Sequence, residues 1–122
     1  MEKPVVNLLK LQNQLRILHW QTDSYAEHKA FGKAYENLDG LIDQLVEVYQ
    51  GKHGRIKYTS PVAMNLVNSD EISIMDILEE FCEYLTVTFT AVVDIAKDPD
   101  LLTIRDEILS EINRLKYLLT LK

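Results

Sequence analysis

The stretch that decides the fold runs from Ser24 to Gln50 and reads SYAEHKAFGKAYENLDGLIDQLVEVYQ. Two sets of apolar residues recur in it every seven positions: Phe31, Leu38 and Leu45, and then Tyr35, Ile42 and Tyr49. At about 100° per residue, these positions cover one side of a helix. Ser24 followed by Glu27 is typical of a capping box. Gly51 and Gly54 are expected to end the helix near Gln50.

Three more amphipathic segments accompany this helix. The first runs from about Pro4 to Gln21, with leucines at spacings of three and four. The third is expected from Ser69 to about Lys97. Its stretch Leu85–Phe89 is β-branched and aromatic enough for a strand, but the helical period on either side favours a helix. The last segment begins at Asp98-Pro99, a cap followed by proline at the first helical position.

The connections between the segments predict how they are arranged. Residues 51–68 form an 18-residue connection, which is longer than two touching antiparallel helices need. It is expected to cross from one end of a bundle to the other. Four helices with two short connections and one long crossover predict an all-α, ferritin-like antiparallel four-helix bundle, with the crossover between its second and third helices. Residues 1–122 are expected to form a single domain.

Composition and charge narrow the class of protein further. The 122 residues include 13 basic and 19 acidic side chains, a net charge of -6. This balance disfavours a broad electropositive surface for DNA or anionic lipid. Cys82 is the single cysteine, so an intrachain disulfide and a cysteine-rich zinc site are excluded. The sequence has neither an apolar run of roughly 20 residues nor a signal peptide after Met1, which predicts a cytoplasmic protein with no membrane partner.

Histidine and carboxylate side chains gather on the first two helices. His19 falls on the leucine-rich side of the first helix. Measured from His28, three carboxylates lie at about 20°, 60° and 100° around the second helix, those of Asp39, Asp43 and Glu47. Carboxylates four residues apart repel each other by roughly 0.2–0.5 kcal/mol per pair. A divalent cation would relieve this repulsion and bind the imidazoles as well.

The same pattern has an ordinary structural interpretation. A row of acidic residues at the edge of an apolar face is commonly a solvated surface. A histidine on an apolar side is commonly a core residue with one hydrogen bond. Helical periodicity therefore leaves both a metal site and a plain helical surface open.

The histidines and acids also share their order and spacing with a known family. His19-Trp20, a second histidine nine residues later at His28, and acids fifteen and nineteen residues after that at Asp43 and Glu47 resemble the Dps family (DNA-binding proteins from starved cells, mini-ferritins). In that family a His-Trp pair closes the first helix, and a second histidine opens the second helix. The resemblance is strongest over the first two helices.

The resemblance implies a ferroxidase site at a two-fold dimer interface. The two histidines of one chain, His19 and His28, would face two acids of the other. These acids are Asp43 and Glu47, with Asp39 as a substitute or supporting carboxylate. Imidazole and carboxylate ligands together suit Fe(II), with Zn(II) as a competitor. The resemblance implies a homo-oligomer, which is at least a dimer and could be a hollow shell. This oligomer would oxidise Fe(II) with peroxide or oxygen and store the mineral.

One position departs from the family pattern. The acid expected four residues after His28 is Gly32, which offers no ligand. An intact ferroxidase, a weak mononuclear metal site, and a non-enzymatic oligomeric scaffold or adaptor that lost its metal are therefore all compatible with the sequence. The substitution Gly32→Glu is expected to separate them, since a degraded metal site should gain affinity and a scaffold should change only in stability.

Binding to nucleic acid is not expected. Members of the Dps family that bind DNA generally use a mobile tail rich in Lys and Arg, whereas only three residues precede Pro4 here and the last helix is expected to run almost to Lys122. Residues 52–57, Lys-His-Gly-Arg-Ile-Lys, form the only basic cluster. Its three cations would give a shallow salt dependence against phosphate. A solvated loop is the expected interpretation.

Overall fold

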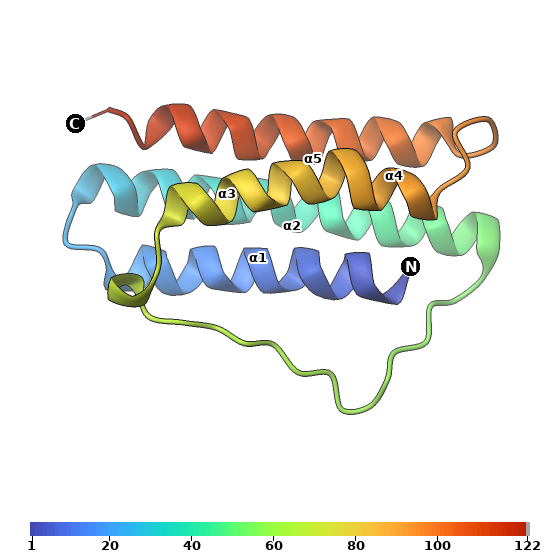
Figure 1. The fold of residues 1–122 in the computed structure, drawn as a ribbon, viewed down its shortest axis with the longest axis horizontal. Coiled ribbons are helices and arrows are strands. Elements are labelled where there is room, and N and C mark those ends of the chain that lie inside the picture. The colour runs from blue at the N-terminus through green and yellow to red at the C-terminus, as the bar shows by residue number, and fades with distance from the viewer. Residues whose placement is uncertain (122) are drawn as a thin grey trace.

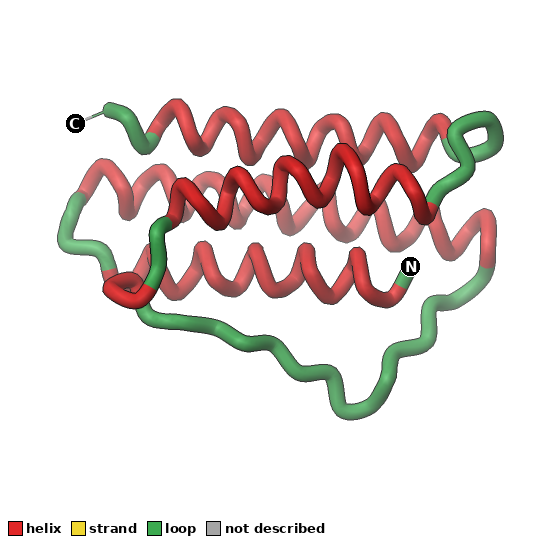
Figure 2. Tube along the Cα trace, viewed as in Figure 1, coloured by secondary structure: helices red, strands yellow, loops and turns green. Residues whose placement is uncertain are grey.

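The computed structural model describes residues 1–121, in which every regular element is helical, and Lys122 lies outside the described residues (Figures 1 and 2). The main helices are α1 (Glu2–Gln21), α2 (Tyr25–His53), α3 (Ile74–Glu83), α4 (Phe89–Val92) and α5 (Pro99–Leu118). A π-helical turn, η2 (Tyr84–Thr88), joins α3 and α4 into one rod. The four rods lie alongside one another, so the expected all-helical bundle is confirmed.

One apolar core holds the four rods together. Each rod contributes side chains that are at most 1% exposed, among them Leu8, Leu38, Phe89 and Ile108. α2 packs against α1 on one side and against α5 on the other, and α3 packs against α5. Burying a leucine, isoleucine or phenylalanine side chain is worth about 1.5–3 kcal/mol. The apolar face of each rod is therefore buried against the other rods of the bundle.

The turn between α1 and α2 contains half of the expected capping box. Ser24 Oγ accepts a hydrogen bond from the backbone N–H of Glu27 at 3.2 Å, as predicted. Glu27 does not reach back to the Ser24 backbone, because its carboxylate accepts from Thr22 Oγ1 at 2.7 Å. Thr22 Oγ1 in turn accepts from the Ser24 N–H. Thr22, and not Glu27, thus accepts the hydrogen bond of the Ser24 backbone N–H.

α2 continues three residues beyond the predicted end at Gln50. Gly51 lies inside the helix, so the prediction that it ends the helix was wrong. The helix ends instead at Gly54, whose φ of +89° is a conformation that glycine adopts without strain. The extension places Lys52 and His53 in the last helical turn, where cationic side chains interact favourably with the helix dipole.

The connection from α2 to the third rod runs along the side of α1 (Figure 2). Side chains of α1 hold it at intervals. Thr59 N–H donates to Glu2 at 2.8 Å, and the Gln14 amide both donates to and accepts from the backbone of Val67, at 2.8 and 2.9 Å. The crossover leads from one end of the bundle to the other, as the sequence predicted. As a result, α2 and the third rod run in the same direction.

The third rod is shorter than predicted at both ends. Ser69–Glu71 forms a separate 3₁₀ turn, η1, because the extended backbone of Ile72 interrupts the helix, and α3 begins one residue after the N-cap Ser73. The rod ends at Val92 and does not reach Lys97. The Asp94 carboxylate accepts hydrogen bonds from the backbone N–H groups of residues 96 and 97, which fixes a turn in place of another helical turn.

The strand-like stretch Leu85–Phe89 is helical, as predicted, but its first part is wound as a π-helix. Phe89 N–H donates to the carbonyl of Tyr84, five residues earlier. Arg105 of α5 reaches across and donates to the Leu85 carbonyl at 3.0 Å and to Thr90 Oγ1 at 2.7 Å. A side chain from the neighbouring rod therefore supplies one hydrogen bond to the irregular turn and one to α4.

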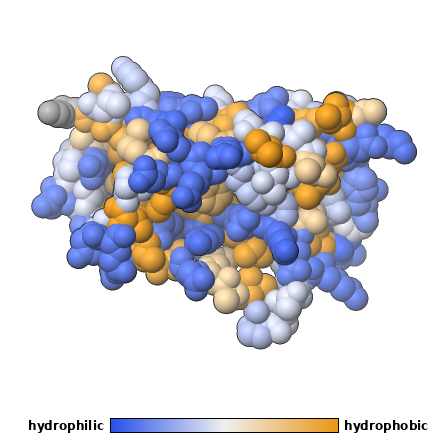
Figure 3. Space-filling view, in the orientation of Figure 1, coloured by the Kyte–Doolittle hydropathy of each residue, from blue (hydrophilic) through white to orange (hydrophobic). Residues whose placement is uncertain are grey.

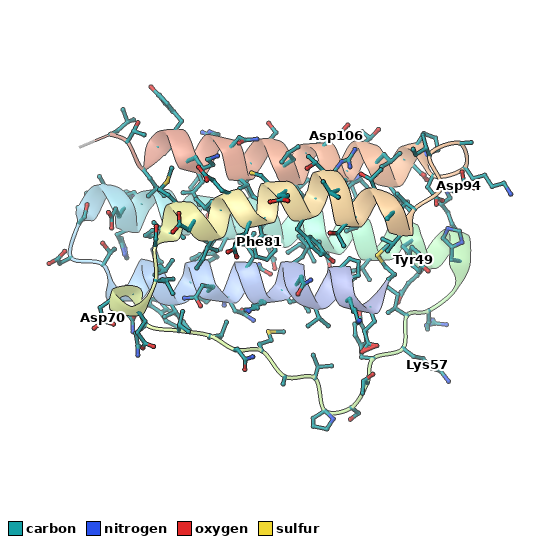
Figure 4. All side chains as sticks on the ribbon, viewed as in Figure 1. Tyr49, Lys57, Asp70, Phe81, Asp94 and Asp106 are labelled. Atoms are coloured by element: carbon teal, nitrogen blue, oxygen red, sulfur yellow. The ribbon has the colours of Figure 1, made fainter. Side chains whose placement is uncertain are left out.

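Asp98 joins the end of α2 to the start of α5. Its carboxylate is 2.9 Å from Lys52 Nζ and 3.2 Å from His53 Nε2, and it accepts from the Asp94 N–H at 2.9 Å. Figure 4 shows Asp94 at the same end of the bundle as Tyr49. The hydrogen bonds from Lys52, from the Asp94 backbone and from His53 hold the pKa of the Asp98 carboxyl far below its usual value. Asp98 thus acts as an ion-paired anchor between helices.

The substitution Asp98→Asn is expected to lower the melting temperature at pH 7, and the difference from wild type should shrink as the solution is acidified. A carboxyl whose pKa is depressed by folding contributes stability above its unfolded pKa, about 3.9, and loses that contribution as the pH falls below it. Melting curves between pH 7 and about pH 2 measure both effects. Asp70→Asn is the control, since that carboxylate is exposed and takes part in none of the ion pairs of residues 1–121. A constant difference over the whole range would contradict the anchor.

The surface of the bundle mixes polar and apolar groups. Figure 3 shows hydrophilic and apolar side chains interspersed over one face. The most exposed large apolar residues include Val87 and Ile95 near the third rod and Trp20 and Tyr25 near the turn between α1 and α2. Within residues 1–121, no helix has both the length and the hydropathy that crossing a membrane requires.

Candidate functional site

His19 and His28 form a closely packed pair where α1 ends and α2 begins. Their rings are stacked, with centroids 3.8 Å apart and planes inclined by 15°. Each ring also bonds the backbone of the other residue. His19 Nδ1 is 2.6 Å from the His28 carbonyl oxygen, and His28 Nδ1 is 2.8 Å from the His19 carbonyl oxygen. The structure therefore brings the two candidate histidines together within one chain.

These two hydrogen bonds decide which ring nitrogens are available. A carbonyl oxygen only accepts, so both Nδ1 atoms must carry the proton. In the neutral form, each Nε2 then keeps a free lone pair. Metal-binding histidines have the same arrangement, in which the second ring N–H donates to a carbonyl or carboxylate. Each ring therefore keeps Nε2 as its remaining acceptor nitrogen.

Gly32 allows the His19 ring to lie where it does. A Cβ atom placed on Gly32 would be 2.9 Å from His19 Cε1 and 3.1 Å from its Nδ1. These distances are shorter than ordinary van der Waals contacts. The position at which the Dps resemblance leads one to expect an acid is therefore filled by the imidazole of the preceding helix. Gly32 explains the close approach of α1 and α2 at this point.

Other aromatic and cationic groups surround the pair. The Tyr35 ring meets the His19 ring edge-on at 5.4 Å, and the Arg16 guanidinium lies over the same tyrosine at 4.7 Å. Tyr25 lies beyond His28 at 6.4 Å and is 74% exposed. Trp20 is 68% exposed and therefore lies outside the core of this chain. The outer edge of the pair is thus aromatic and open to solvent.

The three acids lie further along α2 and are exposed. Asp39 accepts a hydrogen bond from the buried Gln12 amide at 2.9 Å, which fixes one of its oxygens. Asp43 is fifteen residues from His28, or about 22 Å along a helix. Within residues 1–121, no three His, Cys, Asp or Glu side chains lie close enough to hold one metal ion. One chain brings the histidines together and keeps Asp43 and Glu47 apart from them.

A cleft of about 430 Å³ lies beside the histidine pair. Its lining consists of His19, His28, Lys29, Gly32, Lys33 and Glu36. Lys29 and Lys33 were not among the residues predicted for a site. Their spacing of four residues is the sequence signal that places them on one face of α2. The cleft is open on one side and combines imidazole, ammonium and carboxylate groups.

The basic cluster of residues 52–57 is divided in the structure. Lys52 and His53 belong to α2 and bind Asp98, and Lys52 also bonds Asp100 at 2.7 Å. Arg55 and Lys57 lie in the exposed start of the crossover. Two of the four basic groups are thus committed to contacts within the chain.

Part of the chain is similar in sequence to a protein of a bacteriophage. An uncharacterized 14.6 kDa protein of the mobD-ri intergenic region of Enterobacteria phage T4 is 36% identical over 70 residues, 57% of this chain. The match covers 54% of that protein, so the chain spans about half the length of this curated relative. No solved structure matches the chain.

A family match extends over the pair, the cleft and most of the bundle. The family of unknown function DUF5856 matches residues 19–119, which include both histidines, the acids of α2 and all of α3 to α5. This is well over half of the chain. The protein therefore belongs to the DUF5856 family.

Proposed function

We propose that the protein binds a divalent metal ion, Fe(II) with Zn(II) as a competitor, at a site shared by two copies of the chain. The observation that carries this proposal is the stacked pair His19 and His28, whose Nδ1 atoms are both held by carbonyl groups and whose Nε2 atoms are left as ligands. Asp43 and Glu47 of a second copy supply the oxygen ligands. Asp39, oriented by Gln12, is the supporting carboxylate.

Two copies are needed because of the length of α2. His28 and the acids are separated by about 22 Å or more along one straight helix. If two α2 helices pair antiparallel about a two-fold axis near Glu36, which is exposed on the same side as the acids, each histidine pair comes opposite the acids of the other copy. Mixed nitrogen and oxygen ligands suit both Fe(II) and Zn(II). A ferritin-like bundle of the Dps type provides this arrangement.

Iron is the substrate in this proposal. Fe(II) held by the two imidazoles and two carboxylates is oxidised by peroxide or oxygen, as in a ferroxidase, and the product is stored in an oligomeric shell. The chain's own contribution is to hold the imidazoles in the tautomer that leaves Nε2 unprotonated.

The proposal predicts that Zn(II), or Fe(II) without oxygen, raises the melting temperature of the protein. A metal at one hundred times its Kd stabilises by about 2.7 kcal/mol, on the order of 10 °C for a domain of this size. His28→Ala should abolish the shift, while His53→Ala should preserve it because His53 binds Asp98 at the other end of α2. Melting curves that are identical with and without metal would overturn the proposal.

A mixing experiment tests whether the site is shared. Two variants are needed. One carries His28→Ala, and the other carries both Asp43→Asn and Glu47→Gln. Each variant alone should fail to bind Zn(II). In a heterodimer of the two variants, one site carries every substitution and the other carries none. Refolding them together should restore about a quarter of the wild-type zinc stoichiometry. No recovery, although heterodimers form, would place all ligands in one chain.

The second candidate function is a non-enzymatic scaffold or adaptor that kept the bundle without the metal. The position of Gly32 favours it, because the His19 ring occupies the space of the missing acid. In this case the histidine pair only joins α1 to α2, and the metal experiments above give no shift.

A further inference from the structure

The outer face of α2 carries a row of exposed residues. α2 packs against α1 on one side and α5 on the other, and the face between these contacts is open to solvent (Figure 1). At about 100° per residue, eight exposed positions fall within an arc of about 80° on this face. These positions, which we call the α2 seam, are Tyr25, Lys29, Lys33, Glu36, Gly40, Asp43, Glu47 and Gly51.

The charges of the α2 seam have no ionic partner within the chain. None of the ion pairs among residues 1–121 includes a seam residue. Glu36 lines the same cleft as the two lysines, yet it forms no ion pair with either of them. Lys33 and Asp43 are separated by ten residues, or about 15 Å along the helix, which is too far for a pair. The seam is therefore basic in its first half and acidic in its second half.

The seam is also symmetric about residue 38. Each position has a counterpart at the same distance on the other side, which gives the pairs Lys29 and Glu47, Lys33 and Asp43, Glu36 and Gly40, and Tyr25 and Gly51. If two identical helices pair antiparallel about a two-fold axis at this level, each residue comes opposite its counterpart in the other copy. Every lysine of the seam then lies opposite an acid, and no two like charges lie directly opposite each other.

The two glycines of the seam independently indicate a close partner. Gly40 and Gly51 both lie inside α2, although glycine destabilises a helix interior relative to alanine. A Cβ atom on either one would have no neighbour within 4 Å, so contacts within the chain do not require glycine at these positions. A second α2 helix explains both glycines, because Glu36 and Tyr25 of one copy would lie over the bare backbone of the other.

We infer that two copies of the chain pair antiparallel through the α2 seam, with the lysines of each copy bound to the acids of the other. This inference keeps the two copies of the proposed function but does not need its metal, because a lysine ammonium and a metal ion are alternative partners for Asp43 and Glu47. One exposed ion pair contributes little. Four such pairs act together here, and like-charge repulsion disfavours other registers.

An exchange of charges tests the seam. The variant Lys29→Glu/Lys33→Glu makes every charge of the seam negative, and the variant Asp43→Lys/Glu47→Lys makes both of its ends positive. The mass of the full chain is measured by sedimentation velocity in EDTA at low salt, where wild type is expected to be a dimer. Each variant alone should dimerise about a hundredfold more weakly, because all four pairs become repulsive. An equimolar mixture should dimerise again, since the four pairs return with their signs exchanged.

Two further variants support this comparison. Lys3→Glu/Lys57→Glu makes the same change in net charge at exposed lysines outside α2 and should remain a dimer. Gly40→Glu should weaken the dimer, although it raises the helix propensity of the single chain. Circular dichroism of every variant should show the helix content of wild type, because all the substituted positions are exposed.

The outcomes separate the seam from the metal site. Dimers that persist in both charge variants overturn the seam, and so does a mixture of the two variants that stays monomeric. A wild-type chain that is monomeric in EDTA and dimerises only with Zn(II) overturns the seam and leaves the proposed function intact. A seam-dependent dimer in EDTA that binds no zinc supports the seam and overturns the metal site.

Discussion

Phe89→Ala is expected to reduce the free energy of unfolding by about 3–5 kcal/mol. Phe89 is fully buried and begins α4 directly after the π-helical turn, so its ring fills the core from the third rod. Removing it leaves a cavity that the flanking rods close only in part. Because domains of this size unfold with about 5–15 kcal/mol, the variant should lose a large part of its stability.

Urea unfolding followed by circular dichroism measures this loss. Val87→Ala is the matched control, because Val87 lies in the same irregular turn and its side chain is 64% exposed. It should cost less than about 0.5 kcal/mol. If the two variants lost similar amounts of unfolding free energy, the burial of Phe89 would not be what stabilises the third rod.

The sequence predicted the fold where the apolar period is long and regular. The repeat through Phe31, Leu38 and Leu45 identified α2, and all three residues are buried. The breaks in the third rod escaped prediction because they depend on contacts with other parts of the chain. Arg105 supports the π-helical turn from α5, and the turn after Val92 is held by Asp94 and Asp98. Periodicity along one segment carries no information about such partners.

The candidate site was predictable in a similar, partial way. Helical periodicity placed His19 on the leucine-rich side of the first helix, and the structure brings it into contact with His28. The exchange of hydrogen bonds between their rings and backbones depends on how closely α1 approaches α2, which no spacing in the sequence reveals. The role of Gly32 was also predictable only in part. The resemblance shows that an acid is missing at this position, whereas the structure shows that the His19 ring occupies the space of a side chain there.

Gly32→Glu is therefore expected to weaken the site and not to restore it. The new Cβ atom would lie 2.9 Å from His19 Cε1, so the imidazole must shift, and its 2.6 Å hydrogen bond to the His28 carbonyl is strained. Losing that bond costs about 1–3 kcal/mol, which outweighs the gain in helix propensity of up to about 1 kcal/mol. We therefore expect a net loss of unfolding free energy and loss of the zinc-induced rise in melting temperature. Differential scanning calorimetry with and without Zn(II) measures both.

Gly40→Glu provides the comparison within the same helix. Gly40 is exposed, and a Cβ atom there would have no neighbour within 4 Å. Replacing a mid-helix glycine with a good helix former at an open position stabilises by up to about 1 kcal/mol. The two substitutions thus introduce the same side chain into α2 and should have opposite effects on stability, because only Gly32 faces another helix. If Gly32→Glu increases the zinc shift instead, the carboxylate is the ligand that the site lacks, and the contact between His19 and Gly32 is not what holds the imidazoles in place.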